Sequence, residues 1–407
     1  MKAKHSTDLF SFLAKQIESF LQTHHSEHYE AHQERRRAGG NPGSTKTEEI
    51  FQMGFTFSFP VNQIGINRGT LVRWTKGFDI DEAIGQDVCE LLQREIDALH
   101  LPVKVAALVN DTVGTLMARS YTSPGKTGTL LGAIFGTGTN GAYVESLSKI
   151  RKLAPPSQGE YDDRTGEMII NTEWGSFDND LTVLPNTAYD SALDALTPNP
   201  GIQMFEKRVS GMFLGEILRQ ALLALVKDDT TQLFRDETSA DNDARSTTCI
   251  AEDSALYKPW GVDTSFLSIA KADGSPGLGA IRAALAKDLG VDAASAEDAE
   301  AVKILVDAIG RRSARLSAVA IAAVVINTGN HISNEGAKAE ENYVDVGVDG
   351  SLVEFYPGFE DEIRGALREV KELGDTGEKR IRIGIAKDGS GVGAALIALV
   401  AAGRSGG

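Results

Sequence analysis

A loop of three glycines and two threonines interrupts an apolar run at residues 136–141 (GTGTNG). The successive backbone N–H groups and two hydroxyl groups of such a turn suit an anionic phosphate group. The flanking runs, LLGAIF and AYVE, are typical of paired strands, so the sequence of the loop also fits a plain glycine hairpin turn. The loop taken alone leaves both interpretations open.

A carboxylate follows the short apolar stretch at residues 104–109 (KVAALV), which is typical of a buried strand in an α/β sheet. Asn110 and Asp111 then stand at the carboxyl end of that strand, where α/β folds bind ligands. An aspartate in this place can accept a proton from a substrate hydroxyl group. It can equally cap the helix that follows, and the spacing does not decide between these roles.

Four further polar residues have types and positions that suit the binding of a polyol, although Lys76 could equally steady a phosphate group. Lys76 and Glu173 lie close to tryptophans in the motifs WTKGF and NTEWGSF. Gln203 and Glu206 are three residues apart in a predicted helix and would share one of its faces. Each sugar hydroxyl group needs a donor and an acceptor, which amides and carboxylates provide. Each of these residues alone is also typical of an ordinary solvated surface.

Two patterns imitate ligand sites but have simpler explanations. SPGKTG (123–128) lacks the first glycine of a P-loop, because Ser120 stands there, and a strand follows it. His24, His28 and His32 could share one helix face as metal ligands. They lie among charged residues, which favours a solvated face, and no metal site is predicted.

The elements expected around these residues alternate between strands and helices, which indicates an α/β fold. We expect helices over 8–32, 81–99, 200–226 and 300–326, and strands over 51–60, 104–109, 130–135, 142–145 and 166–171. Residues 343–357 are expected to form a strand, a turn and a strand, and 380–403 a strand, a glycine turn and a helix.

The composition limits the classes of function. The chain has 407 residues, enough for two or three domains, and its 42% apolar and 24% charged residues are typical of soluble globular proteins. A net charge of −16 opposes a nucleic-acid partner, and the basic run Arg35–Arg37 is too short to supply one. Cys89 and Cys249 form no disulfide framework, which favours a reducing cytosol. No apolar run is long enough for a membrane span.

Several motifs, in the same order along nearly the whole chain, resemble the eukaryotic hexokinase family and within it the fungal glucokinases. These motifs are GFTFSFP (54–60), WTKGF (74–78), VNDTVGTL (109–116), GTGTN (136–140), NTEWGSF (171–177), PGIQMFEKR (200–208), VGVDGS (346–351) and GSGVGAAL (389–396).

The resemblance implies an actin-like α/β fold of two domains, each built on a ribonuclease-H-like sheet. It places the small domain at 1–109 plus 391–407 and the large domain at 110–390. It also implies that ATP, carrying Mg²⁺, phosphorylates the 6-hydroxyl group of glucose or a related hexose. No membrane partner is implied, and the oligomeric state cannot be read.

The resemblance further assigns roles to individual residues. Asp111 matches the base that takes the proton of the 6-hydroxyl group, and Lys76 is expected to assist it. The sugar site is matched by Ser58, Phe59, Thr75, Lys76, Asn110, Asp111, Asn140, Glu173, Gln203 and Glu206. The nucleotide site is matched by Gly136, Thr137, Gly138, Gly350 and Ser351, with Thr264 a weaker match nearby.

One part of the family pattern is absent from the sequence. The family carries a first phosphate loop of the type Asp-Gly-Gly-Thr, and no such run occurs here. We therefore expect a small domain that is incomplete at its N-terminus and has an unpaired strand edge. A non-catalytic glucose-binding protein is the alternative this raises. A transcription-linked sugar sensor would need a basic surface, which the sequence does not indicate.

Overall fold

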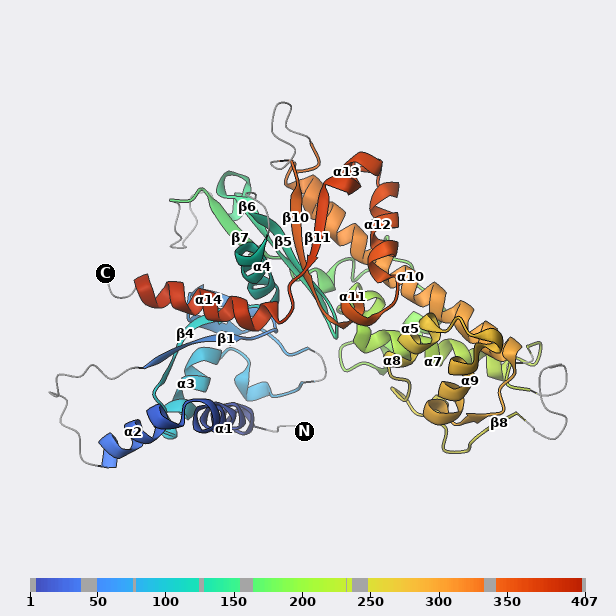
Figure 1. Ribbon diagram of the computed structural model, residues 1–407, viewed down its shortest axis with the longest axis horizontal. Coiled ribbons are helices and arrows are strands. Elements are labelled where there is room, and N and C mark those ends of the chain that lie inside the picture. Colours follow the sequence, from blue (N-terminus) through green and yellow to red (C-terminus); the bar gives the residue numbers. More distant parts are fainter. Residues whose placement is uncertain are drawn as a thin grey trace. The chain divides into compact units, whose positions relative to one another are not determined.

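The computed structural model describes residues 5–37, 50–75, 78–123, 128–153, 164–231, 233–235, 248–332 and 342–404 (Figure 1). The chain divides into two compact units. The first comprises Met1–Tyr121 and Asp388–Gly407, and the second comprises Thr122–Lys387. The first division lies beyond the expected boundary at 109/110, because helix α4 (Asp111–Thr122) groups with the first unit up to Tyr121. The second lies three residues before the expected boundary at 390/391.

The first unit is built around two parallel strands, β1 (Phe51–Thr56) and β4 (Val103–Val109). Helices α1 (Ser6–His24) and α3 (Val88–Ala98) share one apolar cluster with Val103 and Val105 of β4. Helix α14 (Gly389–Arg404) packs with Ala106 and Ala107 of the same strand. The sheet therefore has a helical layer on each face. The unit also contains α2 (Ser26–Arg37), the turn η1 (Asp81–Ala83) and the hairpin β2 (Val61–Gly65) with β3 (Arg68–Leu71).

Glycines explain how closely α14 approaches its neighbours. A Cβ atom at Gly54 of β1 would overlap the backbone of Ala394, and one at Gly393 would overlap the backbone of Gly114 in α4. The motif GSGVGAAL, in which the sequence suggested a glycine turn, instead forms the first turns of α14 and provides the small surface that packs on β1 and α4.

The second unit contains a five-stranded sheet in the order β11-β10-β5-β6-β7. Strands β5 to β7 are antiparallel neighbours, whereas β10 runs parallel to β5 and β11. The bounds are β5 (Thr129–Phe135), β6 (Thr139–Ser146), β7 (Glu167–Asn171), β10 (Val344–Asp349) and β11 (Ile381–Ile385). The apolar residues of β5 and β10 belong to the core cluster, so these two strands form the buried centre of the sheet.

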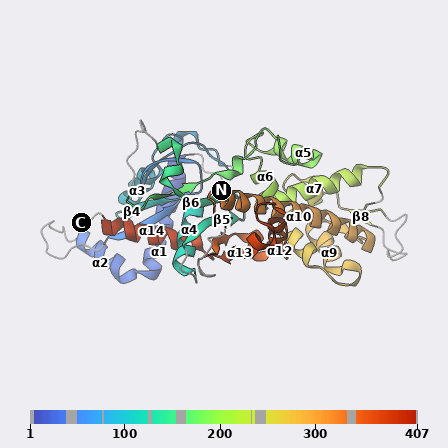
Figure 2. The ribbon, with the colours of Figure 1, turned by 90° about the horizontal axis from the view of Figure 1, so that it is seen from above.

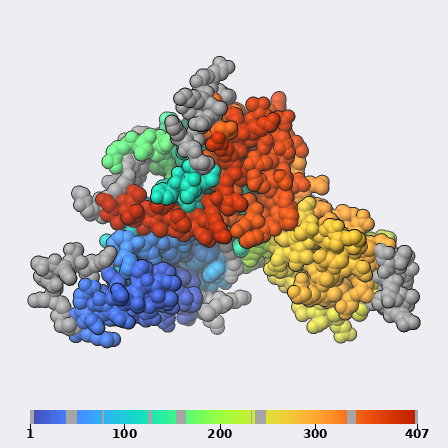
Figure 3. All heavy atoms as spheres, in the orientation of Figure 1, coloured from blue at the N-terminus to red at the C-terminus, as the bar shows by residue number. Residues whose placement is uncertain are grey.

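A long helix organises the rest of the second unit. Helix α10 (Ala296–Asn327) contacts α7 (Gly211–Lys227), which runs alongside it in Figure 2, and also α12 (Phe359–Glu369). Helices α8 (Ser265–Ala272) and α9 (Gly279–Ala284) pack against the first part of α10 as a continuous surface, yellow to orange in Figure 3. The remaining elements are α5 (Ala188–Leu196), α6 (Glu206–Val209), α11 (Ser351–Phe355), α13 (Gly374–Arg380) and the pair β8 (Cys249–Ile250) with β9 (Val291–Asp292). None of the described helices combines the length and apolar character that crossing a membrane requires.

Most expected elements are confirmed, including the strand at 104–109, the hairpin around the glycine loop and the helices ending near 326 and 403. The expected single helix over 8–32 is two helices, because the chain leaves the helical conformation at His25 (φ −139°). The expected helix over 81–99 begins only at Val88, where the side chain of Asp87 accepts the N–H groups of Cys89 and Glu90.

Two expectations were wrong. Residues 200–205 form turns and not the start of a helix, and Ser210 separates α6 from α7. Gln203 has a positive φ of 61°, so it does not share a helix face with Glu206. Residues 343–357 are not two strands, since α11 follows β10 directly. Gly350, with φ 115°, turns the chain there, and Leu352 of α11 is buried in the core.

Candidate functional site

The candidate residues divide between the two units. In the first unit, the N–H group of Phe57 donates to the carbonyl oxygen of Val109 at 2.9 Å, so the carboxyl ends of β1 and β4 lie side by side. Residues 58–59 and 110–111 therefore follow adjacent parallel strands at one edge of the sheet. This edge is where α/β folds bind their ligands.

Asn110 and Asp111 both take part in capping helix α4, since Asp111 Oδ1 also accepts the N–H group of Thr112, at 2.8 Å. Helix α4 begins at Asp111, so Asn110 occupies the capping position. The Oδ1 atom of Asn110 accepts the N–H group of Thr112 at 3.0 Å and its hydroxyl group at 2.5 Å. Asp111 is half-buried in the first turn of α4, where the partial positive charge of a helix N-terminus stabilises a carboxylate.

An aromatic cluster positions the other candidates of this unit. The rings of Phe59 and Trp74 are 4.8 Å apart, and Phe78 stacks on Trp74 at 5.5 Å. The indole N–H group of Trp74 donates to the carbonyl oxygen of Ile80 at 2.8 Å, which anchors the ring. The cluster thereby holds 58–59 next to the segment that carries the buried Thr75. Lys76 lies outside the described residues.

In the second unit, Asn140 and Glu173 belong to one hydrogen-bond network. The side-chain amide of Asn140 donates to Glu173 Oε1 at 3.3 Å and to Asn171 Oδ1 at 2.7 Å. Asn171 donates in turn to Glu173 Oε1 at 2.9 Å. A Cβ atom at Gly141 would overlap the ring of Trp174, so the glycine lets this ring pack against β6.

Gln203 and Glu206 form hydrogen bonds to residues next to Asn140 and Glu173. Glu206 Oε2 accepts the N–H group of Thr139 at 3.0 Å, and Gln203 Oε1 accepts the hydroxyl group of Ser176 at 2.5 Å. A Cβ atom at Gly175 would lie 3.2 Å from the side chains of both residues. The structure therefore brings together the four sugar-site candidates of this unit, although Gln203 and Glu206 share no helix face.

Two of these residues have strained backbones. Glu173 has a φ of 49° and Gln203 a φ of 61°, the left-handed region that favours glycine. Such a conformation costs roughly 1–3 kcal/mol per residue and is typical of binding and catalytic sites. In this unit the two strained residues, Glu173 and Gln203, both belong to the group of sugar-site candidates.

Two buried cations that the sequence did not single out support α6. Lys207 Nζ donates to Asp194 Oδ1 at 2.6 Å, and Arg208 donates to the carbonyl oxygens of Pro185 and Met204, both at 2.6 Å. Burial lowers the pKa of both side chains, and for Lys207 the carboxylate of Asp194 opposes this effect. These contacts fix the segment that carries Gln203 and Glu206. The sequence EKR (206–208) did not predict the burial of Lys207 and Arg208, because adjacent charged residues usually indicate a solvated surface.

The glycine loop and the later turn meet in the second unit. A Cβ atom at Gly136 would lie 3.2 Å from Gly350, and one at Gly350 would lie 2.5 Å from the backbone of Phe135. The start of α7 joins them, since Gly211 donates its N–H group to Gly136 at 2.7 Å and Met212 donates to Thr137 at 3.2 Å. The candidates Gly136, Thr137, Gly138, Gly350 and Ser351 are therefore brought together.

Thr264 belongs to the same cluster but has a structural role in it. Its hydroxyl group donates to the carbonyl oxygen of Gly211 and accepts the N–H group of Gly215 at 3.1 Å. The absence of Cβ atoms at Gly136 and Gly350 lets the two turns pack against each other, which brings their backbone amides into one place. We name the set 136–138, 211, 264 and 350–351 the glycine cluster.

The histidines of the first two helices take part in packing. His24 lies 4.7 Å from the ring of Phe20, His28 lies 4.7 Å from that of Phe51, and a ring nitrogen of His32 lies 2.9 Å from the carbonyl oxygen of His100. In the part of the chain that the structure describes, no three His, Cys, Asp or Glu residues are grouped as a metal site would need.

Comparison with known proteins agrees with these observations. A family model described as hexokinase matches residues 130–400, and a second hexokinase model matches 1–121. The chain is 59% identical to a glucokinase of Aspergillus niger over 394 residues, which cover 97% of this chain and 76% of that protein. It is 41% identical to glucokinase-1 of Saccharomyces cerevisiae, covering 97% and 75%.

The structural comparison leads to the same family. A hexokinase of Schistosoma mansoni, solved in complex with glucose, superposes with a TM-score of 0.73 at 33% identity, over 97% of this chain and 76% of that one. The expected fold class, an α/β fold of the actin-like sugar-kinase type, is thereby confirmed.

Proposed function

This chain belongs to the hexokinase family, and we propose that it transfers the γ-phosphoryl group of ATP to the 6-hydroxyl group of glucose. The observation that carries the proposal is that Asn140, Glu173, Gln203 and Glu206 gather in one part of the second unit, each held by a hydrogen bond. Carboxylates and amides held by partners in this way present fixed acceptors and donors to the hydroxyl groups of a sugar.

Asp111 is the proposed general base. Its carboxylate takes the proton of the 6-hydroxyl group while the oxygen bonds to the γ-phosphorus and the bond to the β-phosphate bridging oxygen breaks. ADP leaves, and glucose 6-phosphate forms. Since phosphoryl transfer requires little covalent chemistry from the protein, most of the catalysis comes from positioning and charge stabilisation. Ser58, Phe59, Thr75, Lys76 and Asn110 are proposed to help to position the sugar, and Lys76 also to act in catalysis.

The glycine cluster is the proposed site of the ATP phosphates. Its backbone amides and the hydroxyl group of Thr137 are the groups that would contact them, and Gly350 and Ser351 would contact the nucleotide. Mg²⁺ would arrive bound to ATP and neutralise phosphate charge. We propose a cytoplasmic location, and the −16 charge of the chain argues against a nucleic-acid partner.

A coupled assay tests this function directly. The chain with ATP, Mg²⁺ and glucose is expected to form glucose 6-phosphate, and omission of any of the three is expected to abolish product formation. Folded protein that binds glucose in calorimetry but forms no product would support the alternative, a non-catalytic glucose-binding protein. The 59% identity to a glucokinase favours the enzyme.

Replacing Gly350 with alanine is expected to raise the KM for ATP roughly tenfold and leave glucose binding unchanged. The new Cβ atom would lie 2.5 Å from the backbone of Phe135, at a φ of 115°. Strain of roughly 1–3 kcal/mol would push the turn away from the loop, and 1.4 kcal/mol corresponds to a factor of ten in affinity. Steady-state kinetics with ATP varied measures the effect.

Gly358→Ala is the matched control. Gly358 also has a positive φ, 74°, but a Cβ atom there would meet nothing within 4 Å. The Gly358→Ala variant therefore imposes backbone strain without a clash at the glycine cluster. An equal rise in the KM for ATP in both variants would remove the support for a nucleotide site at Gly350.

A further inference from the structure

Asn140 is followed directly by Gly141, and this is the only Asn-Gly pair in the sequence. Asparagine is among the thermolabile residues of proteins, because the backbone nitrogen of the next residue can attack its side-chain amide. A glycine at that next position favours the attack, since it has no Cβ atom to shield its nitrogen. The fold requires this glycine, because a Cβ atom at Gly141 would overlap the ring of Trp174. The packing of Trp174 therefore places a reactive pair among the sugar-site candidates.

The backbone nitrogen of Gly141 lies against the amide that it would attack. Its N–H group donates to Oδ1 of Asn140 at 2.8 Å. The C=O group of Gly141 accepts the N–H group of Thr172 at 2.9 Å, on the side of β7, and in an antiparallel pair the N–H group points to that same side. Gly141 precedes the first paired residues of β6 and β7, Ala142 and Asn171. Its N–H group therefore contacts a side chain in place of a strand, and nitrogen and amide already meet in the folded chain.

Three neighbours hold this amide in the orientation that ring closure needs. Nδ2 donates to Asn171 Oδ1 at 2.7 Å and to Glu173 Oε1 at 3.3 Å, so Oδ1 is turned toward Gly141. The hydroxyl group of Thr172 lies 3.2 Å from Oδ1 and 2.8 Å from the carbonyl oxygen of Gly141. Negative charge develops on Oδ1 when the nitrogen bonds to Cγ, and a hydroxyl group beside such an oxygen stabilises it. Thr172 is thus placed as the donor for this step.

We propose that Asn140 and Gly141 form a self-modifying site whose reaction switches off sugar binding. The nitrogen of Gly141 forms a bond to Cγ of Asn140, the Cγ–Nδ2 bond breaks, and Nδ2 leaves as ammonia with the proton that the nitrogen has lost. Water then opens the cyclic imide at either of the two C–N bonds of its ring. The products are aspartate or isoaspartate at position 140, and water is the only other reactant.

Neither product can replace Asn140 in the sugar site. The amide donates to Glu173 at 3.3 Å, whereas a carboxylate in its place has no donor and repels the neighbouring negative charge. Isoaspartate also lengthens the backbone by one carbon atom at the start of β6. This consequence rests on the proposed function, in which Asn140 binds the sugar. Because a bound glucose would engage the amide and exclude water, we expect the sugar to protect its own site.

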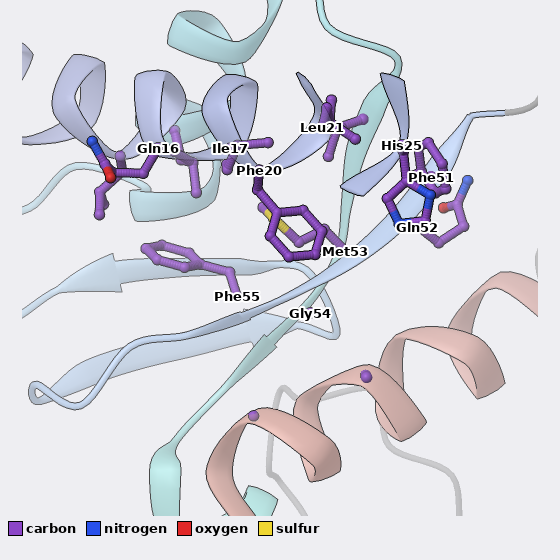
Figure 4. Close-up of a pocket in the computed structure, with 15 residues that line it drawn as sticks. Gln16, Ile17, Phe20, Leu21, His25, Phe51, Gln52, Met53, Gly54 and Phe55 are labelled. Carbon is purple, nitrogen blue, oxygen red and sulfur yellow. The ribbon is translucent and has the colours of Figure 1, made fainter. Parts of the chain in front are cut away.

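Peptide mapping by mass spectrometry tests the reaction on the full chain. The protein is incubated at mildly alkaline pH with and without saturating glucose, and each asparagine is followed over time. Asn140 is expected to convert faster than any other asparagine, and glucose is expected to slow its conversion at least tenfold. Asn62 of β2, which precedes Gln63, is the internal reference for a strand asparagine without a following glycine. Gln52 of β1, drawn in Figure 4, is the reference for an amide side chain that is longer by one carbon atom.

Variants at Thr172 test whether the neighbours promote the step. Thr172→Val removes the hydroxyl group at nearly constant shape and is expected to slow the conversion at least threefold, whereas Thr172→Ser should retain the rate. Thr165→Val is the matched control, because Thr165 is an exposed threonine just before β7, whose hydroxyl group donates to the carbonyl oxygen of Glu167 at 3.1 Å. Its conversion rate should equal that of the unchanged protein. Asn140→Asp makes one product directly and is expected to lower the glucose affinity at least tenfold in calorimetry.

Two results would overturn the proposal. One is an Asn140 that converts no faster than Asn62, which would mean that strand pairing holds the backbone of β6 too firmly for ring closure. This comparison uses the unchanged protein, so it is informative even if a variant unfolds. The other is an unchanged glucose affinity in the converted protein or in Asn140→Asp. Failure of the proposed function is a separate result, since fresh, unmodified protein would then neither bind nor phosphorylate glucose.

Discussion

Asp111→Asn is expected to lower kcat for glucose phosphorylation by about 10²–10⁴-fold while glucose still binds. The amide has nearly the same shape as the carboxylate but cannot accept the proton of the 6-hydroxyl group. Helix α4 should be retained, because Asn110 accepts the N–H group of Thr112 at 3.0 Å and an amide oxygen can replace Asp111 Oδ1, which accepts the same group at 2.8 Å. The loss should therefore fall on kcat and spare the glucose affinity, which calorimetry measures separately.

Asp97→Asn controls for the chemical change itself. Asp97 is an exposed aspartate of the same unit, in α3, and its side chain accepts a hydrogen bond from Gln93 at 2.9 Å. We expect its kinetics to match those of the unchanged protein. A kcat for Asp111→Asn within threefold of the unchanged value would contradict the role of Asp111 as general base.

The features that the sequence predicted correctly depend on residues that are neighbours in the chain. An apolar run followed by Asn110 and Asp111 places both at the end of β4, since strand length and direction follow from the run itself. The glycine loop between two apolar runs is the hairpin of β5 and β6. In both cases local pattern and tertiary packing agree.

The features that the sequence missed depend on partners far away in the chain. The interrupted helix at 200–226 is one example, because the carbonyl oxygen of Pro185 and the carboxylate of Asp194 hold Arg208 and Lys207 in the interior. Helix propensity and spacing contain no information on those partners. The contact between Gly136 and Gly350, more than two hundred residues apart, is a second example. Only the family resemblance suggested that these two turns act together.

A buried ion pair behind the sugar-site segment gives the largest expected effect on stability. Arg312 of α10 forms a two-pronged contact with Asp190 of α5, both hydrogen bonds measuring 2.8 Å, and the side chains are 19% and 2% exposed. Burial acts to raise the pKa of Asp190, but the hydrogen bonds and charge of Arg312, together with the hydrogen bonds from Thr187, outweigh it, and the pKa lies below its ordinary value. The pair therefore stabilises the fold above the unfolded pKa, and this contribution is lost as the pH falls through the folded pKa.

Asp190→Ala is expected to destabilise the second unit by roughly 3–5 kcal/mol, because it leaves the Arg312 charge buried without its partner. Urea unfolding followed by tryptophan fluorescence measures this, since two of the three tryptophans, Trp174 and Trp260, lie in that unit.

The double variant Asp190→Ala/Arg312→Met should recover much of the loss of stability by removing the unpaired charge. Glu369→Ala is the control, because it breaks the exposed pair between Glu369 of α12 and Arg315 of α10 and should leave the unfolding midpoint unchanged. Equal shifts for Asp190→Ala and Glu369→Ala would show that burial of the ion pair does not govern the stability of this unit.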